Sequence, residues 1–189
     1  MCGAAVYSVS VGERGQDRAL VVELPEGTAL ILSDGAGGVV GGEQAADLVI
    51  QQTRAWLAVL GRLPDAEEWA RWLVRLDERL LAEPLAGDAT AVCVSLAGSE
   101  IAGASVGDSE AWLVCGSDSI VLTRHQHRKP LLGGGEAVPV PFSSSCAVAG
   151  CLIIGSDGLF RFVKEEAILR AAADRDVERA ARDCAHEGQ

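Results

Sequence analysis

The sequence predicts an α+β fold, in which helices pack on antiparallel sheets, and three observations lead to this prediction. Short apolar runs separated by turn residues are typical of strands that pair in antiparallel fashion. Between residues 43 and 80, two segments instead carry apolar residues at three- and four-residue steps, as helices do. Two further helical patterns follow residue 164. This order of strands, two helices, strands and terminal helices favours helices that cover antiparallel sheets.

The first part of the chain is predicted to form strands and then helices. The predicted elements are strands over 4–11, 18–24 and 29–34, then helices over 43–60 and 65–80. The turn residues Pro25-Glu26-Gly27 predict a hairpin between the second and third strands. Gly61 and Pro64 end the first helix, and the acidic residues Glu67 and Glu68 favour a helix start near Asp65.

Strands return after residue 88 and are joined by turn residues. The predicted elements are strands over 90–96, 101–106, 111–115, 120–123 and 151–156, then helices over 164–173 and 176–186. Residues 125–145 contain the run Gly133-Gly134-Gly135 and several prolines, among them Pro139 and Pro141, so this segment is expected to be an irregular, mobile loop over the functional site.

The overall composition limits the class of protein. With 189 residues, 49% of them hydrophobic, the chain is expected to form a single domain over 1–189. A net charge of −11 disfavours nucleic acid and anionic membrane as partners, although divalent cations can adapt an acidic cleft to a phosphorylated substrate. The six cysteines form no CxxC pair, and no signal peptide or membrane span is evident, so buried thiols in a reducing cytoplasm are expected.

Three aspartates follow predicted strands, each beside a glycine. They are Asp34, Asp108 and Asp157. A single Asp-Gly pair is a common turn signal and indicates little. Three acids at strand ends, next to residues without bulk, predict one acidic metal-binding site built from distant segments, because carboxylate oxygens are the ligands that hard divalent cations prefer.

Five motifs, weak individually, resemble in their chain order the successive motifs of the metal-dependent protein phosphatases, the protein phosphatase 2C family. They are Arg14-Gly15-Gln16-Asp17, Asp34-Gly35-Ala36-Gly37-Gly38, Gly87-Asp88-Ala89-Thr90-Ala91-Val92, Val106-Gly107-Asp108-Ser109 and Ser156-Asp157-Gly158-Leu159. The resemblance covers roughly residues 4–170. It implies an αββα sandwich of two stacked antiparallel sheets flanked by helices. It also implies two core Mn²⁺ or Mg²⁺ ions in the cleft between the sheets, with a weaker third ion possible.

The resemblance assigns roles to five residues around these ions. By position, Asp34 would bridge the two metals, the carbonyl of Gly35 would ligate one of them, and Asp157 would ligate the other. Asp17 would orient metal-bound water as a catalytic residue, and Asp108 would hold the third ion together with Asp157.

Basic side chains are expected to receive the substrate. Arg14 is the candidate for the catalytic arginine that binds the phosphate. His125 and Arg128 belong to the cluster His125-Gln126-His127-Arg128-Lys129, which is either a plain polar loop beside the cleft or a set of groups that helps to bind a phosphorylated peptide.

The function that follows from the resemblance is a bacterial-type, cytoplasmic protein serine/threonine phosphatase. It would hydrolyse phosphoserine or phosphothreonine through a metal-bridging hydroxide and work beside a cognate Ser/Thr kinase. The bacterial assignment rests on two lysines against fourteen arginines, which hints at a GC-rich genome.

Some positions depart from the family pattern. Ala36 and Glu110 replace residues usual in the family, and the C-terminal strand with its last metal-binding acid is not found before Gln189. The domain is therefore expected to be incomplete at its C-terminus. This expectation keeps two alternatives open: a catalytically impaired, phosphatase-like binding or regulatory module, and a phosphohydrolase of small molecules.

Overall fold

The computed structural model describes residues 15–36, 41–116, 118–146, 150–174 and 176–187. The first part contains a hairpin and two helices. They are β1 (Asp17–Leu24), β2 (Gly27–Asp34), α1 (Gly42–Leu60) and α2 (Ala66–Leu81). Six strands and three helices follow among the described residues. They are β3 (Ala91–Ala97), β4 (Glu100–Val106), β5 (Glu110–Cys115), β6 (Asp118–Val121), β7 (Val140–Ser145), β8 (Cys151–Gly155), α3 (Asp157–Phe162), α4 (Glu165–Ala172) and α5 (Val177–Glu187).

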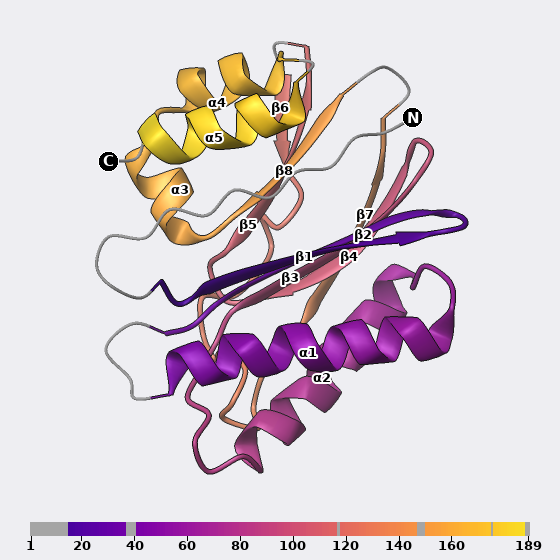
Figure 1. The fold of residues 1–189 in the computed structure, drawn as a ribbon, viewed down its shortest axis with the longest axis vertical. Coiled ribbons are helices and arrows are strands. Elements are labelled where there is room, and N and C mark those ends of the chain that lie inside the picture. The colour runs from indigo at the N-terminus through magenta and orange to yellow at the C-terminus, as the bar shows by residue number, and fades with distance from the viewer. Residues whose placement is uncertain (1–14, 37–40, 117, 147–149, 175, 188–189) are drawn as a thin grey trace.

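These elements form four layers, so the predicted αββα sandwich is confirmed (Figure 1). One antiparallel sheet has the strand order β1-β2-β3-β4-β7, and the other has the order β6-β5-β8. Helices α1 and α2 cover the first sheet, and α3, α4 and α5 lie on the side of the second (Figure 1). The hairpin predicted around Pro25-Glu26-Gly27 joins β1 to β2, with Leu24 opposite Gly27.

Three apolar clusters separate the four layers. Along the central strand β3, alternate side chains enter different clusters, because successive residues of a strand point to opposite faces. Cys93 packs with residues of α1 and α2, whereas Val92 and Val94 pack with Leu113 of β5 between the sheets. The third cluster joins Ile168 and its neighbours to the outer face of the second sheet. Both faces of each sheet are therefore covered.

Tryptophans fill the contact between α1 and α2. The rings of Trp56 and Trp72 stack with centroids 4.5 Å apart, and Trp69 meets Trp56 edge-on at 5.3 Å. The buried indole N–H groups are satisfied, since Trp69 donates to Ser95 Oγ at 2.8 Å and Trp72 to Thr53 Oγ1 at 2.9 Å. These rings fix both helices against the first sheet, as the apolar spacing of the sequence predicts.

The segment 125–145 differs from its prediction as an irregular loop. Its last part is β7, which pairs with β4 at the edge of the first sheet. Pro141 and three serines interrupt the apolar alternation that would indicate a strand in the sequence. Proline is nevertheless tolerated at a sheet edge, where one side of the strand makes no backbone hydrogen bonds to a neighbouring strand. Helix α3 was also not predicted, and β6 begins two residues earlier than expected. The predicted strand over 4–11 lies outside the described residues.

Candidate active site

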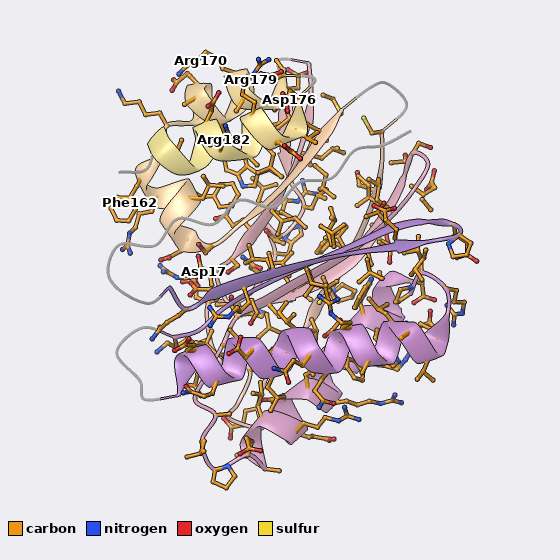
Figure 2. All side chains as sticks on the ribbon, viewed as in Figure 1. Asp17, Phe162, Arg170, Asp176, Arg179 and Arg182 are labelled. Atoms are coloured by element: carbon orange, nitrogen blue, oxygen red, sulfur yellow. The ribbon has the colours of Figure 1, made fainter. Side chains whose placement is uncertain are left out.

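Two of the predicted site residues meet as cross-strand neighbours. Asp17 begins β1 and Asp34 ends β2, and the ladder places them directly opposite each other. The second sheet joins them through Ser156, which follows β8 and donates its hydroxyl to Asp17 Oδ2 at 2.8 Å. Figure 2 shows Asp17 at the end of β1 that faces the α3 side of the molecule. One end of each sheet therefore contributes to a common site.

A buried threonine connects Asp34 to the turn that carries Asp108. Thr90 Oγ1 accepts a hydrogen bond from the backbone N–H of Asp34 at 3.1 Å and lies 2.7 Å from Ser109 Oγ. Gly107 has a positive φ of 97°, and a Cβ there would lie 2.8 Å from Thr90 Cγ2. The turn can approach Thr90 this closely because residue 107 is glycine.

Gly35 allows a second close approach. A Cβ added to Gly35 would lie 2.2 Å from the carbonyl oxygen of Gly42, at the start of α1. The backbone N–H of Gly35 donates to the Gln16 carbonyl at 3.3 Å, and Ala36 N–H donates to the Asp88 carbonyl at 2.9 Å. The end of β2 is thus held by backbone contacts on both sides, which fixes the residue that follows Asp34.

The carboxyl of Asp34 lies in a strongly acidic environment. Partial burial, a hydrogen bond with the Asp17 side chain and the negative charges of Asp17, Asp157 and Asp108 raise the pKa of Asp34 to about 8. Burial is the largest of these causes, because it disfavours the ionised form. The four predicted acids are therefore close enough to act on one another, and at neutral pH Asp34 keeps its proton when no cation is near.

Two of the four aspartates, Asp108 and Asp157, form ion pairs with arginines. Arg128 Nε and Nη2 lie 3.2 Å and 2.7 Å from Asp108 Oδ2. Arg161, one turn further along α3, lies 3.5 Å from Asp157 Oδ2. Within the described ranges, no three acidic, histidine or cysteine side chains are grouped so that they could hold an ion as they lie. An ion shared by Asp34, Asp108 and Asp157 would therefore compete with these arginines for the carboxylates of Asp108 and Asp157.

The chemistry of these residues fits a divalent cation. Their donor atoms are carboxylate and backbone oxygens, the ligand type of Mg²⁺ and Mn²⁺. The raised pKa of Asp34, caused by burial and by neighbouring acids, shows that the site favours added positive charge. A cation would offset the repulsion that otherwise keeps Asp34 protonated.

The structure brings together most, but not all, of the predicted site residues. Asp17, Asp34, Asp108 and Asp157 converge, and Gly35, next to Asp34, forms a bridge with Ala89. Arg128 reaches this group through Asp108.

The structure gives no contact between His125 and the four converging aspartates among the described residues. The histidine is exposed, and its Nε2 accepts from Arg124 Nε at 3.0 Å. Arg14 lies outside the described residues. The supporting roles of Thr90 and Ser156 were not predicted, although both hydroxyl residues lie within the motifs that carry the candidate acids.

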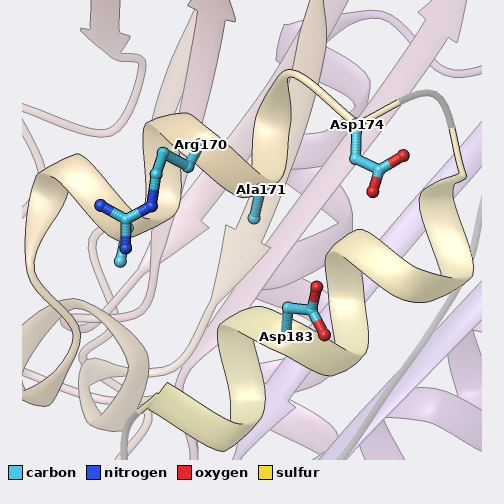
Figure 3. A pocket seen from close by; sticks show the side chains of 5 residues that line it. Arg170, Ala171, Asp174 and Asp183 are labelled. Carbon is cyan, nitrogen blue, oxygen red and sulfur yellow. The ribbon is translucent and has the colours of Figure 1, made fainter.

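A separate hollow lies between α4 and α5. Figure 3 shows it closely, and none of the four acids is among the residues that line it. The lining residues are Ala167, Arg170, Ala171, Asp174 and Asp183. This hollow is therefore distinct from the candidate active site.

Solved structures share the fold of this chain. The serine/threonine phosphatase Stp1 from Staphylococcus aureus has a TM-score of 0.79 and 18% identity, over 93% of this chain and 84% of that one. The PPM Ser-Thr phosphatase MsPP from Mycobacterium smegmatis, in complex with cacodylate, has a TM-score of 0.76 and 22% identity, over 97% and 89%. The catalytic domain of the serine threonine protein phosphatase PstP, in complex with two manganese ions, has a TM-score of 0.76 and 22% identity, over 95% and 86%.

No family model matches the sequence, and the comparison with curated proteins finds no match. At these identities the solved structures show the fold alone. The chain has the fold of these bacterial phosphatases.

Proposed function

We propose that this chain, which has the fold of the PPM serine/threonine phosphatases, is itself a metal-dependent protein serine/threonine phosphatase. The observation that carries the proposal is the convergence of Asp17, Asp34, Asp108 and Asp157, supplied by both sheets, on one acidic site. A likeness of fold does not fix an activity, so the proposal rests on these side chains.

In this proposal the acids hold two core ions of Mn²⁺ or Mg²⁺. Asp34, the Gly35 carbonyl and Asp157 would hold these ions, and Asp108 with Asp157 would offer a weaker third position. Ions bound there supply Lewis acidity toward the phosphate and lower the pKa of water. Asp17 is held by the Ser156 hydroxyl and would orient the water that attacks phosphorus.

Arg128 is the described cation best placed to meet a substrate phosphate. Its guanidinium is exposed and lies at the rim of the acidic site on Asp108, so a phosphoryl oxygen could replace the carboxylate as its partner. Arg14 is proposed for the same task. The proposed substrates are phosphoserine and phosphothreonine in proteins or peptides, and the proposed setting is the cytoplasm beside a Ser/Thr kinase.

The test is phosphate release from a phosphothreonine peptide and from p-nitrophenyl phosphate, with and without Mn²⁺. We expect turnover that depends on the metal and falls at least about 100-fold in Asp34→Asn and Asp157→Asn, because each variant removes a proposed charged ligand. Glu67→Gln is the matched control, since this exposed carboxylate on α2 lies outside the site. Full activity of Asp34→Asn would overturn the assigned site.

A second candidate is a phosphoprotein-binding module without turnover. It is favoured by two separate observations: Asp108 and Asp157 are paired with arginines, and the described side chains contain no ready-made group of three metal ligands. This candidate predicts phosphopeptide binding with no phosphate release at saturating Mn²⁺. A third candidate, a hydrolase of small phosphate esters, predicts turnover of p-nitrophenyl phosphate or nucleotides but not of phosphopeptides.

A further inference from the structure

Two cysteines from different sheets touch each other. Cys115 is the last residue of β5 in the second sheet, and Cys146 follows directly after β7 in the first. Their Sγ atoms lie 2.8 Å apart, and both are thiols. This distance is well inside ordinary contact between sulfur atoms, so the two side chains point at each other across the gap between the sheets.

The surroundings hold this pair in place. Cys115 and Cys146 both pack against the apolar cluster between the sheets. A Cβ added to Gly150 would lie 2.8 Å from Cys146 Sγ and 3.1 Å from Cys115 Sγ, so a residue without a side chain leaves the room that the two sulfurs occupy. Both cysteines are half-buried, and a small oxidant can therefore reach them from solvent.

The other described cysteines are less suited to oxidation. Cys93 is fully buried on β3, and its burial raises the pKa of its thiol far above the ordinary range. Burial also raises the pKa of Cys151, which begins β8. Cys93 is closed off from solvent, and Cys151 Sγ contacts the Leu152 carbonyl, whereas Cys115 and Cys146 already contact each other, so Cys93 and Cys151 are expected to stay reduced under mild oxidation. The sequence predicted buried thiols in a reducing cytoplasm, but Cys115, Cys146 and Cys151 are only half-buried.

We propose that Cys115 and Cys146 form a reversible disulfide that fastens the two sheets together, with a peroxide or a small-molecule disulfide as the oxidant. The bond joins parts of the chain that touch here mainly through apolar side chains. It lies at the far end of β5 from Asp108, about 17 Å along the strand. The proposed effect is therefore on the stability of the sandwich, and it is independent of the proposed phosphatase activity.

The chemistry balances with hydrogen peroxide as the oxidant. The two sulfurs already lie 2.8 Å apart, so either thiol can complete the bond once the other is oxidised, and Cys146 is taken as the first to react. Its thiolate attacks the O–O bond, which breaks to give a sulfenic acid and, after protonation, one water. Cys115 sulfur then attacks the sulfenic sulfur, loses its proton and displaces the hydroxyl as a second water. Two thiols are oxidised to one disulfide, and one peroxide is reduced to two waters.

The test counts thiols by mass. The reduced full-length chain is treated with equimolar peroxide and unfolded in the presence of iodoacetamide. Mass spectrometry then counts the alkylated thiols. Six cysteines should be alkylated before oxidation and four after it, and dithiothreitol should restore six. Cys115→Ser and Cys146→Ser should each keep all five remaining thiols, while the matched control Cys151→Ser should still lose two.

Stability provides the second readout. Oxidation should raise the melting temperature of the wild-type chain by roughly 5–10 °C, since the bond closes a long loop, and should leave Cys115→Ser unchanged. The proposal fails if the wild-type chain keeps six alkylated thiols, if Cys115→Ser still loses a pair, or if the linked species is a dimer on a non-reducing gel. Phosphatase activity plays no part in these outcomes, so the two proposals can fail separately.

Discussion

Asp34 is the residue in which burial and charge act together most strongly. Its backbone N–H is held by Thr90, its side chain is hydrogen-bonded to Asp17, and two further acids act on it. A carboxyl with a pKa near 8 carries a proton at neutral pH, so binding of a cation must displace that proton. A metal ion and a proton therefore compete for the carboxylate of Asp34.

The pH dependence of stability tests this competition. An acid whose pKa is raised in the folded chain contributes stability below the ordinary pKa, near 4, and loses it as the pH rises through the folded value, about 8. We expect the melting temperature of the metal-free chain to fall by several degrees between pH 5 and pH 9, relative to Asp34→Asn measured in parallel. A constant difference between the two proteins over this range would contradict the raised pKa.

Asp77 is a second aspartate with a buried side chain, and its role is structural. This buried residue of α2 accepts three backbone hydrogen bonds, from Gly133 at 2.7 Å, Gly135 at 3.0 Å and Ala137 at 2.8 Å. The segment that the sequence predicted to be a mobile loop is thus held to α2 by one carboxylate over 133–137.

We expect Asp77→Asn to lower the free energy of unfolding by about 2–3 kcal/mol, because the amide NH₂ that replaces one carboxylate oxygen cannot accept from the Ala137 N–H and the charge that strengthens the other two bonds is lost. Chemical denaturation measures this loss. The exposed neighbour Glu78 provides the control, and Glu78→Gln should change stability by less than about 0.5 kcal/mol. Equal effects of the two changes would show that the contacts of Asp77 do not hold the loop.

Among the elements, α2 shows how local sequence and tertiary packing agree. Asp65 caps its start, with Asp65 Oδ1 accepting from Glu68 N–H at 2.7 Å and the Glu68 side chain accepting from Asp65 N–H at 3.1 Å. The apolar face of the helix buries Trp69 and Trp72. Capping fixes where the helix begins, and the tryptophans fix which face meets the sheet.

The cap can be tested alone. Asp65→Ala should lower the free energy of unfolding by about 1 kcal/mol, because it leaves the backbone N–H of Glu68 without its side-chain acceptor. Thermal unfolding of Asp65→Ala beside Asp65→Ser separates the causes, since serine also caps helices and should recover most of the loss. No recovery with serine would point to the charge of Asp65 instead of its hydrogen bond.

Periodic elements could be predicted from the sequence, and elements defined by their neighbours could not. The spacing in α1 and α2 and the strands before Asp34 and Asp157 are local signals, and they predicted these elements well. Strand β7 has no such signal, because Pro141 and serines replace apolar alternation and its pairing with β4 decides its structure. Helix α3 is a single short segment after Ser156, which is too short for periodicity to show.

The candidate site was partly predictable for the same reason. Glycines beside Asp34, Asp108 and Asp157 mark the ends of strands, and these acids do converge. The arginine contacts depend on which residues face each other in space. Arg161 is close to Asp157 in the sequence, but Arg128 is distant from Asp108, and no spacing rule identifies such a pair.

At the scale of the whole molecule, the acids tie the two sheets into one unit. Asp17 and Asp34 belong to the first sheet, whereas Asp157 follows β8 of the second. A cation held by acids of both sheets would bind the folded chain but not the unfolded one, and such binding stabilises the folded state.

We therefore expect Mn²⁺ to raise the melting temperature with increasing concentration, and to release about one proton per chain at pH 7 as Asp34 ionises. Calorimetry in two buffers of different ionisation enthalpy measures the proton release. Asp34→Asn should abolish it, and Glu67→Gln should not. Unchanged melting temperatures at millimolar Mn²⁺ would contradict metal binding by the folded chain.

The proline in β7 has a consequence for how copies of this chain behave toward each other. Among the described strands, β7 pairs only with β4, so it presents an outer border at which a further strand could join. Pro141 is exposed on this strand and removes one of the N–H donors that such joining would use. The border is thereby made a poor template for fibril growth, and a β-branched residue at position 141 would remove that protection against aggregation.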